Sequence, residues 1–346
     1  MRSMVLTDIG AMKLVEAPDP KIERDTDVLL DIKVVGVCGS DVHYYTTGRI
    51  GSQVVQHPFR VGHECSATVK EVGSKVTGLK PGDLVAVDPA AACGECAQCK
   101  SGRPHTCRNL TFLGTPGQGE GCLCDQIVMP AESCFPVPEG VTPEQAAIIE
   151  PLSIGAYSVQ MTAPMQGARI AILGCGPIGL SVLMPARVQG AGKIYVTDKI
   201  DDRLRVAEQA GACWTGNPDK EDIVASITEQ EPLLLDAVLE CCGQQDALDQ
   251  SIELLKPGGK LVIVGIPEVD RVSFSIDRLR RHEICVQNIR RQNGCVQAAI
   301  DLVASGEINV DFMVTHHFPL ERTKEAFDMV HNYEDGVVKA LIEVSS

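Results

Sequence analysis

Apolar residues in the first third of the chain fall into short β-type runs separated by turn residues. Branched apolar residues alternate or cluster over 28–35, 66–72 and 83–87, and Pro81 and Gly82 come just before the last run. Runs of this length bounded by glycine and proline are typical of strands. The pattern predicts a compact β-rich lobe with long loops.

After about residue 150 the pattern changes to short apolar strands that alternate with helices. The expected strands lie at 169–173, 193–197, 237–240 and 260–264, and the expected helices at 178–189, 203–210 and 246–255. This alternation is typical of βαβ units around a parallel sheet. Beyond residue 286 the rhythm is less clear, and 316–319 and 336–344 are candidate strands that return to the first lobe.

We therefore predict an α/β protein with two domains, because 346 residues are many for one hydrophobic core. The β-rich domain is expected over 1–152, the dinucleotide-type domain over 153–286, and the return to the first domain over 287–346.

Charge and composition exclude several classes of function. The net charge of −15 disfavours nucleic acid and anionic membranes as partners, because both need clustered Lys and Arg. The first thirteen residues lack the apolar segment of a signal peptide, and no apolar run approaches the roughly 18 residues of a membrane span. Fifteen cysteines in such a chain indicate a reducing compartment, so we expect a cytoplasmic protein.

Four cysteines occur within fifteen residues, with the spacing C-x2-C-x2-C-x7-C. This spacing gathers four thiolates into a tetrahedral shell, which zinc favours and which leaves no open position for a substrate. An iron–sulfur cluster also uses four cysteines, so spacing alone leaves the metal open. We interpret the cluster as a structural metal site made by Cys93, Cys96, Cys99 and Cys107.

A glycine-rich turn follows the strand expected at 169–173, with the G-x-G-x-x-G pattern of dinucleotide-binding domains. Its residues are Gly174, Cys175, Gly176, Pro177, Ile178 and Gly179. Asp198 ends the next expected strand, where a carboxylate can bind an adenosine ribose and repel a 2′-phosphate, so NAD is favoured over NADP. Arg203 lies close by, and an arginine can stack on adenine or bind a 2′-phosphate.

A second set of metal-type residues lies upstream of the four cysteines. Cys38, His63 and Glu64 supply a thiolate, an imidazole and a carboxylate, and Glu150 adds a carboxylate at the expected domain boundary. Three protein ligands with an open position are the pattern of a catalytic zinc. His63 alone is more typical of an ordinary loop histidine, but the combination favours a metal site.

Together these motifs resemble those of zinc-dependent medium-chain dehydrogenases. They are C-G-S-D-V-H at 38–43, G-H-E at 62–64, the four-cysteine loop at 93–107 and G-C-G-P-I-G at 174–179. The resemblance implies a GroES-like β-rich domain, built from both ends of the chain, with a Rossmann domain inserted between them.

Within this family the chain is most similar to the polyol branch, the sorbitol (L-iditol 2-) and xylitol dehydrogenases. The similarity lies in V-H-Y-Y at 42–45, Thr115 with Pro116, and I-E-P-L-S at 149–153. The alcohol dehydrogenase branch has a cysteine where Glu150 stands. The resemblance thus implies that a secondary hydroxyl of a small-molecule polyol is oxidised to a ketose.

The resemblance also implies NAD, two zinc ions per subunit (one catalytic, one structural) and a homotetramer. Cys38, His63 and Glu64 would bind the catalytic zinc, and Glu150 would act through the zinc-bound water or exchange with Glu64; we treat the two carboxylates as interchangeable. The remaining residues implied at the cofactor are Asp198, Arg203, Val264, Gly265, Ile266, Asn288 and Arg290. Arg290 would contact the substrate as well.

The chemistry agrees with this resemblance. A zinc ion acts as a Lewis acid that lowers the pKa of a ligated hydroxyl, and the nicotinamide carries the redox step. Ser40 and His43, two and five residues after Cys38, are placed for a hydroxyl–imidazole proton relay, with Glu150 as a rival route. Tyr44 either hydrogen-bonds substrate hydroxyls or packs the cleft.

Three alternatives remain open. Arg291 stands where the animal enzymes have an aromatic residue, and together with Arg290 it suggests an alditol-phosphate dehydrogenase. L-threonine 3-dehydrogenase shares the metal motifs, but it would have threonine in place of Ser40 and an acid-Pro-Phe-Gly turn at 150–153. A catalytically silent zinc- or NAD-binding regulator would have lost a ligand or the relay, and all of these residues are present.

Overall fold

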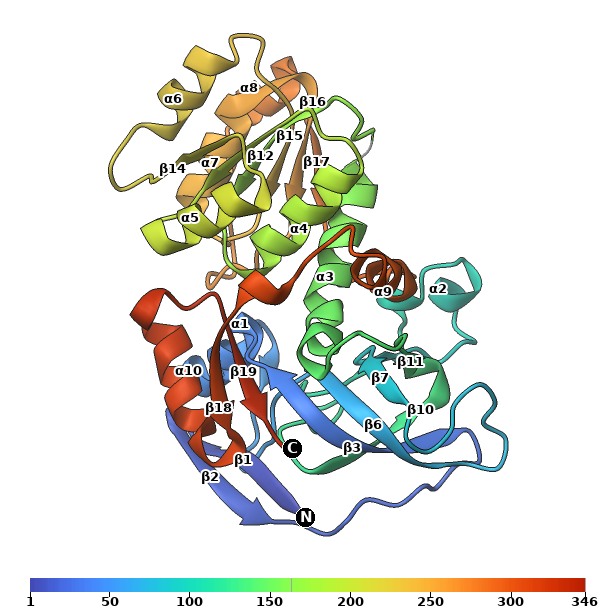
Figure 1. Cartoon of the computed structure of the whole chain (residues 1–346). Coiled ribbons are helices and arrows are strands. Elements are labelled where there is room, and N and C mark those ends of the chain that lie inside the picture. The colour runs from blue at the N-terminus through green and yellow to red at the C-terminus, as the bar shows by residue number, and fades with distance from the viewer. Residues whose placement is uncertain (163, 346) are drawn as a thin grey trace. The chain divides into compact units, whose positions relative to one another are not determined.

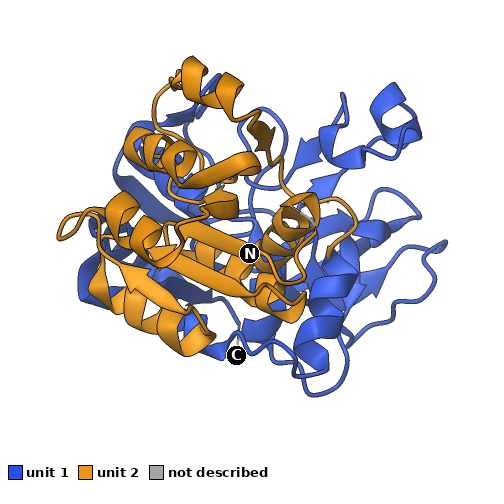
Figure 2. Cartoon of the chain, turned by 90° about the horizontal axis from the view of Figure 1, so that it is seen from above, with its two compact units in different colours: residues 1–150, 296–346 blue, residues 151–295 orange. Residues whose placement is uncertain are grey.

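The computed structural model describes residues 1–162 and 164–345, which form two compact units (Figure 1). Unit 1 contains Met1–Glu150 and the chain from Val296 onward, and unit 2 contains Pro151–Cys295 (Figure 2). The boundary expected after residue 286 cuts β17 (Cys285–Asn288), which belongs to the sheet of unit 2. Unit 2 therefore continues to Cys295.

A seven-stranded sheet forms the centre of unit 1. Its strand order is β11-β7-β6-β3-β19-β18, and β10 also pairs with β3. The strands are β3 (Asp27–Gly36), β6 (Glu64–Val72), β7 (Leu84–Val87), β10 (Gln126–Pro130), β11 (Cys134–Pro136), β18 (Val314–Pro319) and β19 (Lys339–Glu343). β18 and β19 correspond to the candidate strands at 316–319 and 336–344, and they belong to the sheet of unit 1 because β18 pairs with β19 and β19 pairs antiparallel with β3.

Smaller elements surround this sheet. They are β1 (Arg2–Asp8), β2 (Ala11–Glu16), α1 (Gly39–Thr47), β4 (Arg49–Ile50), β5 (Gln53–Val54), β8 (Ala90–Ala91), α2 (Ala97–Lys100), β9 (Thr111–Phe112), α9 (Val296–Ala304) and α10 (Thr323–Asn332). The helix α3 (Pro143–Thr162) begins in unit 1 and continues past Glu150 into unit 2. β3 is the most central strand and is buried along almost its whole length, which explains its run of branched apolar residues. The core of unit 1 therefore lies on both faces of β3.

Unit 2 contains a six-stranded parallel sheet in the order β14-β13-β12-β15-β16-β17. Besides β17 and the C-terminal part of α3, whose bounds are given above, the strands and helices of unit 2 are β12 (Arg169–Leu173), α4 (Pro177–Val188), β13 (Lys193–Thr197), α5 (Asp201–Ala210), β14 (Trp214–Gly216), α6 (Ile223–Gln230), β15 (Leu235–Glu240), α7 (Gln245–Leu254), β16 (Leu255–Ile263) and α8 (Ile276–Arg281). Numbered along the chain, this strand order is 3-2-1-4-5-6, which is the Rossmann order. Helices cover both faces of the sheet (Figure 1).

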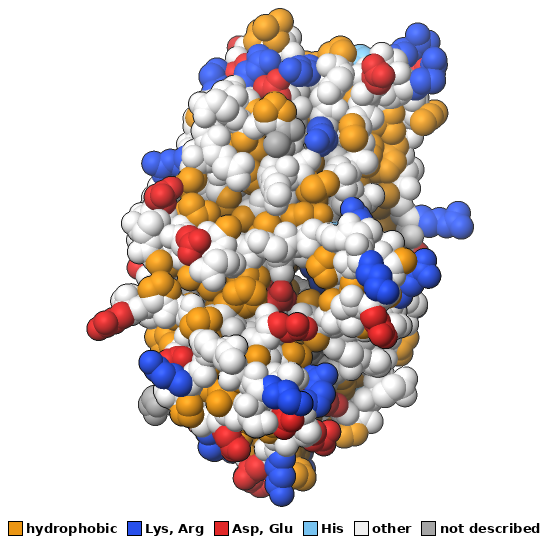
Figure 3. Space-filling view, turned by 90° about the vertical axis from the view of Figure 1, so that its right-hand side faces the viewer, with side chains coloured by type: hydrophobic (Ala, Val, Ile, Leu, Met, Phe, Trp, Pro, Cys, Tyr) orange, Lys and Arg blue, Asp and Glu red, His pale blue; other side chains and the backbone are white. Residues whose placement is uncertain are grey.

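The surface carries charges of both signs. On the face drawn in Figure 3, acidic and basic side chains are interspersed with apolar ones. In the part of the chain that the structure describes, no helix has the length and hydropathy needed to cross a membrane.

Candidate metal and dinucleotide sites

The sheet of unit 1 brings together the thiolate, imidazole and carboxylate expected at a catalytic metal. Cys38 caps the N-terminus of α1 two residues after β3, and His63 directly precedes β6, which begins at Glu64. β3 and β6 are neighbours, and Glu64 lies opposite Gly36. One ligand atom from each of Cys38, His63 and Glu64 lies within 4.8 Å of the others. This mixed donor set fits zinc.

Asp41 holds the ring of His63. Its carboxylate is fully buried, and Oδ1 lies 3.3 Å from Nδ1 of His63 and accepts the N–H of Gly62 at 3.1 Å. A carboxylate at one ring nitrogen leaves the other nitrogen for a metal. Burial alone would lower the pKa of His63, but Asp41 and Cys38 hold it well above its ordinary value. The site therefore has a negative potential that suits a cation.

A buried lysine adjoins Glu64. Lys339 begins β19, and its Nζ donates to Oε2 of Glu64 at 2.5 Å and to the carbonyl oxygen of Val37 at 3.2 Å. Burial alone would lower the pKa of Lys339, but Glu64 raises it, so the ammonium group stays charged. A side chain on Gly36 would clash with Oε2 of Glu64, so a glycine is needed there. Because a carboxylate has two oxygens, Glu64 can bind Lys339 through Oε2 and a metal through Oε1.

Glu150 is another buried carboxyl group of unit 1 and lies on α3. Burial raises its pKa to about 8; His63 opposes this shift, while Glu64 and Asp88 add to it. Among the described residues, the converging ligand atoms come from Cys38, His63 and Glu64 and do not include Glu150. Of the two carboxylates that the sequence left interchangeable, the geometry favours Glu64 as the ligand.

Three further candidates lie on α1. The hydroxyl of Ser40 donates to Sγ of Cys38 at 3.3 Å, which places Ser40 at the edge of the metal-type cluster. His43 lies three residues further along α1, so both side chains project from the same face of the helix. Tyr44 is only 4% exposed and packs in the hydrophobic core, and its hydroxyl donates to Oε1 of Gln53 at 3.2 Å. For Tyr44 the structure favours packing.

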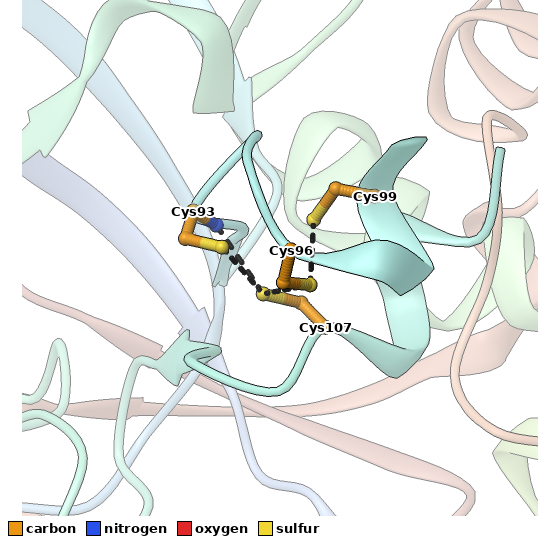
Figure 4. Close-up of side chains that lie close together, drawn as sticks. All are labelled: Cys93, Cys96, Cys99 and Cys107. Carbon is orange, nitrogen blue, oxygen red and sulfur yellow. Dashed lines mark hydrogen bonds between the residues drawn. The ribbon is translucent and has the colours of Figure 1, made fainter. Parts of the chain in front are cut away.

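The four-cysteine loop forms a second metal-type cluster (Figure 4). The sulfur of Cys107 lies 3.4 Å from that of Cys93 and 3.8 Å from that of Cys96, and the sulfurs of Cys96 and Cys99 are 3.5 Å apart. Four thiolates that share one zinc stand about 3.8 Å apart, given Zn–S bonds of about 2.3 Å. An iron–sulfur cluster distributes its four thiolates over two or more irons, so the four sulfurs do not all surround one ion. The spacing therefore fits a single ion.

The three glycines of the dinucleotide turn in unit 2 differ in how much space surrounds the position of a Cβ atom. Gly174 follows β12 with a φ of +98°, and a Cβ there would lie 2.8 Å from Cβ of Cys242. A Cβ on Gly179 would clash with the carbonyl oxygen of Gly174. Gly176 caps α4, and a Cβ there would meet only Nη1 of Arg203, at 3.5 Å. The open space at Gly176 and the N–H groups of the first turn of α4, which begins with Pro177 and Ile178, fit a pyrophosphate.

Asp198 supports this turn from the end of β13. Its Oδ2 accepts the N–H of Cys175 at 2.7 Å, and its Oδ1 accepts the N–H of Ile200 at 2.9 Å. Arg203, on α5, is buried. The acid after the second strand is the position that meets the adenosine ribose in this fold.

The remaining cofactor candidates follow the next strands of the sheet. Val264, Gly265 and Ile266 follow β16, Asn288 ends β17, and Arg290 comes two residues later. Because the carboxyl ends of parallel strands meet at one edge of a sheet, the structure brings these residues to the edge that carries the glycine turn.

Buried charged residues to which the sequence assigned no role include Asp41, Lys339 and Glu240. Asp41 lies inside the motif at 38–43, but the motif alone assigned it no role. Lys339 begins an apolar strand and Glu240 ends one. Isolated charges in apolar runs are the signal that could have identified them, because charged residues are rarely buried without a partner.

A β-rich unit with a thiolate–imidazole–carboxylate cluster, and a Rossmann unit with a glycine turn, define a metal-dependent nicotinamide dehydrogenase. The profile of the alcohol dehydrogenase GroES-like domain matches residues 24–139, and that of the zinc-binding dehydrogenases matches residues 177–305. The chain belongs to the zinc-dependent medium-chain dehydrogenase family. This confirms the predicted fold class, a GroES-like domain with a Rossmann domain.

Individual relatives cover nearly the whole chain. Sorbitol dehydrogenase of Bacillus subtilis is 36% identical, over 99% of this chain and 97% of its own length. An Escherichia coli oxidoreductase of unknown specificity has a TM-score of 0.94 at 30% identity, covering 100% of this chain and 99% of its own. A zinc-binding dehydrogenase of Sinorhizobium meliloti, bound to NADP, has a TM-score of 0.90 at 30% identity and covers 99% of both chains.

Proposed function

We propose that the protein oxidises a secondary hydroxyl of a sugar alcohol to a ketose and transfers the hydride to NAD. The observation that carries this proposal is the convergence of Cys38, His63 and Glu64 within 4.8 Å. The chain also shares 36% identity, over nearly its full length, with a sorbitol dehydrogenase. Because the threonine alternative shares the metal motifs, it is the similarity to a sorbitol dehydrogenase that supports the polyol class over the threonine and alditol-phosphate alternatives.

In this proposal each subunit binds two zinc ions. The catalytic ion is held by Cys38, His63 and Glu64, and when bound it supplies Lewis acidity that lowers the pKa of the substrate hydroxyl. The structural ion is held by the four-cysteine loop, whose thiolates leave no position for a substrate. Glu150 stays off the metal.

Ser40 and His43 carry the hydroxyl proton away from the substrate. The contact of Ser40 with Cys38 supports this role, because it sets the serine hydroxyl beside the proposed catalytic site. A Ser40→Ala variant should lose about 10²–10⁴-fold in kcat while its zinc content stays unchanged. If Ser40→Ala keeps its kcat and Glu150→Gln loses it, the proton leaves by the rival route.

The cofactor binds along the carboxyl edge of the sheet in unit 2. Asp198 meets the adenosine ribose and favours NAD over NADP, with Arg203 beside it. The residues proposed at the nicotinamide end are Val264, Gly265, Ile266, Asn288 and Arg290. One structural relative carries NADP, so the preference needs a direct comparison of the two cofactors.

We also propose that the chain works as a homotetramer in the cytoplasm. Light scattering of the purified protein tests the tetramer directly. A monomer would contradict this part of the proposal and leave the chemistry untouched.

A substrate panel tests the activity. NADH and NADPH formation are followed with sorbitol, xylitol, galactitol, their phosphates and L-threonine, before and after treatment with a chelator. We expect turnover on a free polyol with NAD, lost on chelation and restored by zinc. Activity only on threonine or on a phosphate would keep the fold and overturn the substrate class.

A pair of cysteine variants separates a metal effect from a general effect of losing a thiol. Cys38→Ser removes a proposed ligand and should abolish turnover. Cys213→Ser removes an exposed thiol of unit 2 and should leave turnover unchanged.

A further inference from the structure

Glu240 is a buried carboxylate to which the proposed reaction assigns no role. It ends β15 and is fully buried. Its Oε1 accepts the N–H of Cys242 at 2.7 Å and also that of Gly243. Its carbonyl oxygen accepts the N–H of Val264 at 2.8 Å and that of Gly265 at 2.9 Å. One residue therefore holds two loops, which we name the β15 loop (241–243) and the β16 loop (264–266).

The two loops are packed so closely that their glycines leave no room for a side chain. A Cβ on Gly265 would lie 2.8 Å from Oε2 of Glu240 and would clash with the backbone nitrogen of Gly243. A Cβ on Gly243 would lie 2.5 Å from the carbonyl oxygen of Ile266. The carboxylate of Glu240 thus holds the β15 loop and its backbone carbonyl holds the β16 loop, at a point where the two loops pack directly against each other.

The β15 loop also borders the dinucleotide turn, since a Cβ on Gly174 would lie 2.8 Å from Cβ of Cys242. All three loops follow the carboxyl ends of neighbouring strands, β12, β15 and β16. Ligands of open α/β sheets bind in the crevice beyond these ends. Glu240 therefore organises backbone at the ligand edge of the sheet.

A carboxylate buried at position 240 is energetically unfavourable unless it is hydrogen-bonded. Across residues 1–162 and 164–345, Oε2 of Glu240 finds no hydrogen-bond partner, although it is buried. Burying a charge is unfavourable unless its hydrogen bonds compensate. The two N–H groups of the β15 loop supply that compensation, which indicates that the placement of the loop depends on this acceptor.

We propose that Glu240 is a positioning residue for the nicotinamide half of the cofactor. This inference rests on the proposed function, in which the β16 loop lies beside the nicotinamide. By holding the β15 and β16 loops together, Glu240 sets the backbone groups that the nicotinamide ring and its carboxamide meet. It acts through these loops and does not itself contact the cofactor.

The test compares two ligands that differ only in their nicotinamide half. Calorimetry of the full-length protein gives Kd for NADH and for ADP-ribose, which lacks the nicotinamide ring. Glu240→Ala should raise the Kd of NADH about tenfold and change that of ADP-ribose less than about twofold. Glu240→Gln keeps an amide oxygen that can accept the two N–H bonds, so it should restore most of the NADH affinity.

Two further variants complete the design. Glu229→Ala removes an exposed glutamate of α6 and should change neither Kd. If Glu240→Ala does not fold, Glu240→Asp replaces it, because its shorter side chain withdraws the acceptor and should also weaken NADH selectively.

The outcomes separate the two proposals. A wild-type protein that binds neither ligand overturns the proposed function. A wild type that binds both, with variants that lose NADH and ADP-ribose equally or lose neither, overturns the role of Glu240 alone.

Discussion

The buried pair of Lys339 and Glu64 gives the sharpest prediction for stability. Nζ of Lys339 lies 2.5 Å from Oε2 of Glu64, and the two side chains are only 1% and 2% exposed. Lys339→Met keeps the length of the side chain and removes its charge, which leaves the carboxylate of Glu64 buried without its cation.

Removing one partner of a buried ion pair typically costs about 3–5 kcal/mol, because the other charge stays uncompensated. At about 2–4 °C per kcal/mol for a unit of this size, the melting temperature should fall by roughly 6–20 °C. In Lys339→Met/Glu64→Gln both charges are gone, so we expect most of this loss to be recovered.

The assay is urea and thermal unfolding of the chelated protein, so that bound metal does not mask the effect. Lys324→Met is the matched control, because its partner Asp328 is 41% exposed and surface pairs contribute only about 0–1 kcal/mol. A loss below about 1 kcal/mol in Lys339→Met, or no recovery in the double variant, would refute the reasoning.

Three other predictions follow from the same structure. Gly176→Ala should keep its free energy of unfolding within about 1 kcal/mol of wild type but bind NADH at least about tenfold more weakly. Gly179→Ala should lose about 1–3 kcal/mol or more of unfolding free energy, because its Cβ has no room. Equal stabilities of the two variants would contradict the packing seen at these glycines. Asp41→Asn should lower zinc affinity by about 10–100-fold in a competition titration, and an unchanged affinity would remove its role at the imidazole. Backbone N–H groups lower the pKa of Cys96 to about 6, while burial raises that of Cys99 to about 12, so at pH 7 the former is largely thiolate and the latter a thiol. Zinc binding to the four-cysteine loop should therefore release a proton, seen with an indicator dye in weak buffer, and the apparent affinity should fall as pH decreases; binding without release would contradict this assignment.

Local patterns in the sequence predicted much of the fold. The strands at 169–173 and 193–197 are confirmed as β12 and β13, because central parallel strands are short apolar runs with clear turn residues around them. β14 was missed because it has only three residues. β16 begins at Leu255 and not at residue 260 as expected, because its register shift against β15 takes up the stretch 256–259.

The residues of the candidate site also include some that the sequence predicted and some that it did not. Cys38 and the pair of His63 and Glu64 lie in two short motifs, and the combination of their donor types, with the family resemblance, identified them as candidate metal ligands. The partner of Glu64 is 275 residues away, and only the strand order β6-β3-β19 brings Lys339 beside it. No local pattern encodes that order. Glu240 was missed for a related reason, because its contact with the β16 loop depends on how β15 and β16 pair.

Turnover should depend on a metal held by Cys38, His63 and Glu64 and not on one held by the four-cysteine loop. A zinc titration of chelated wild type and Cys38→Ser tests this, with metal content and polyol-dependent NADH formation followed together. Both proteins should refill the four-cysteine loop, but only the wild type should bind a second zinc and regain turnover. Turnover in Cys38→Ser, or full turnover in wild type before that second zinc binds, would contradict this dependence.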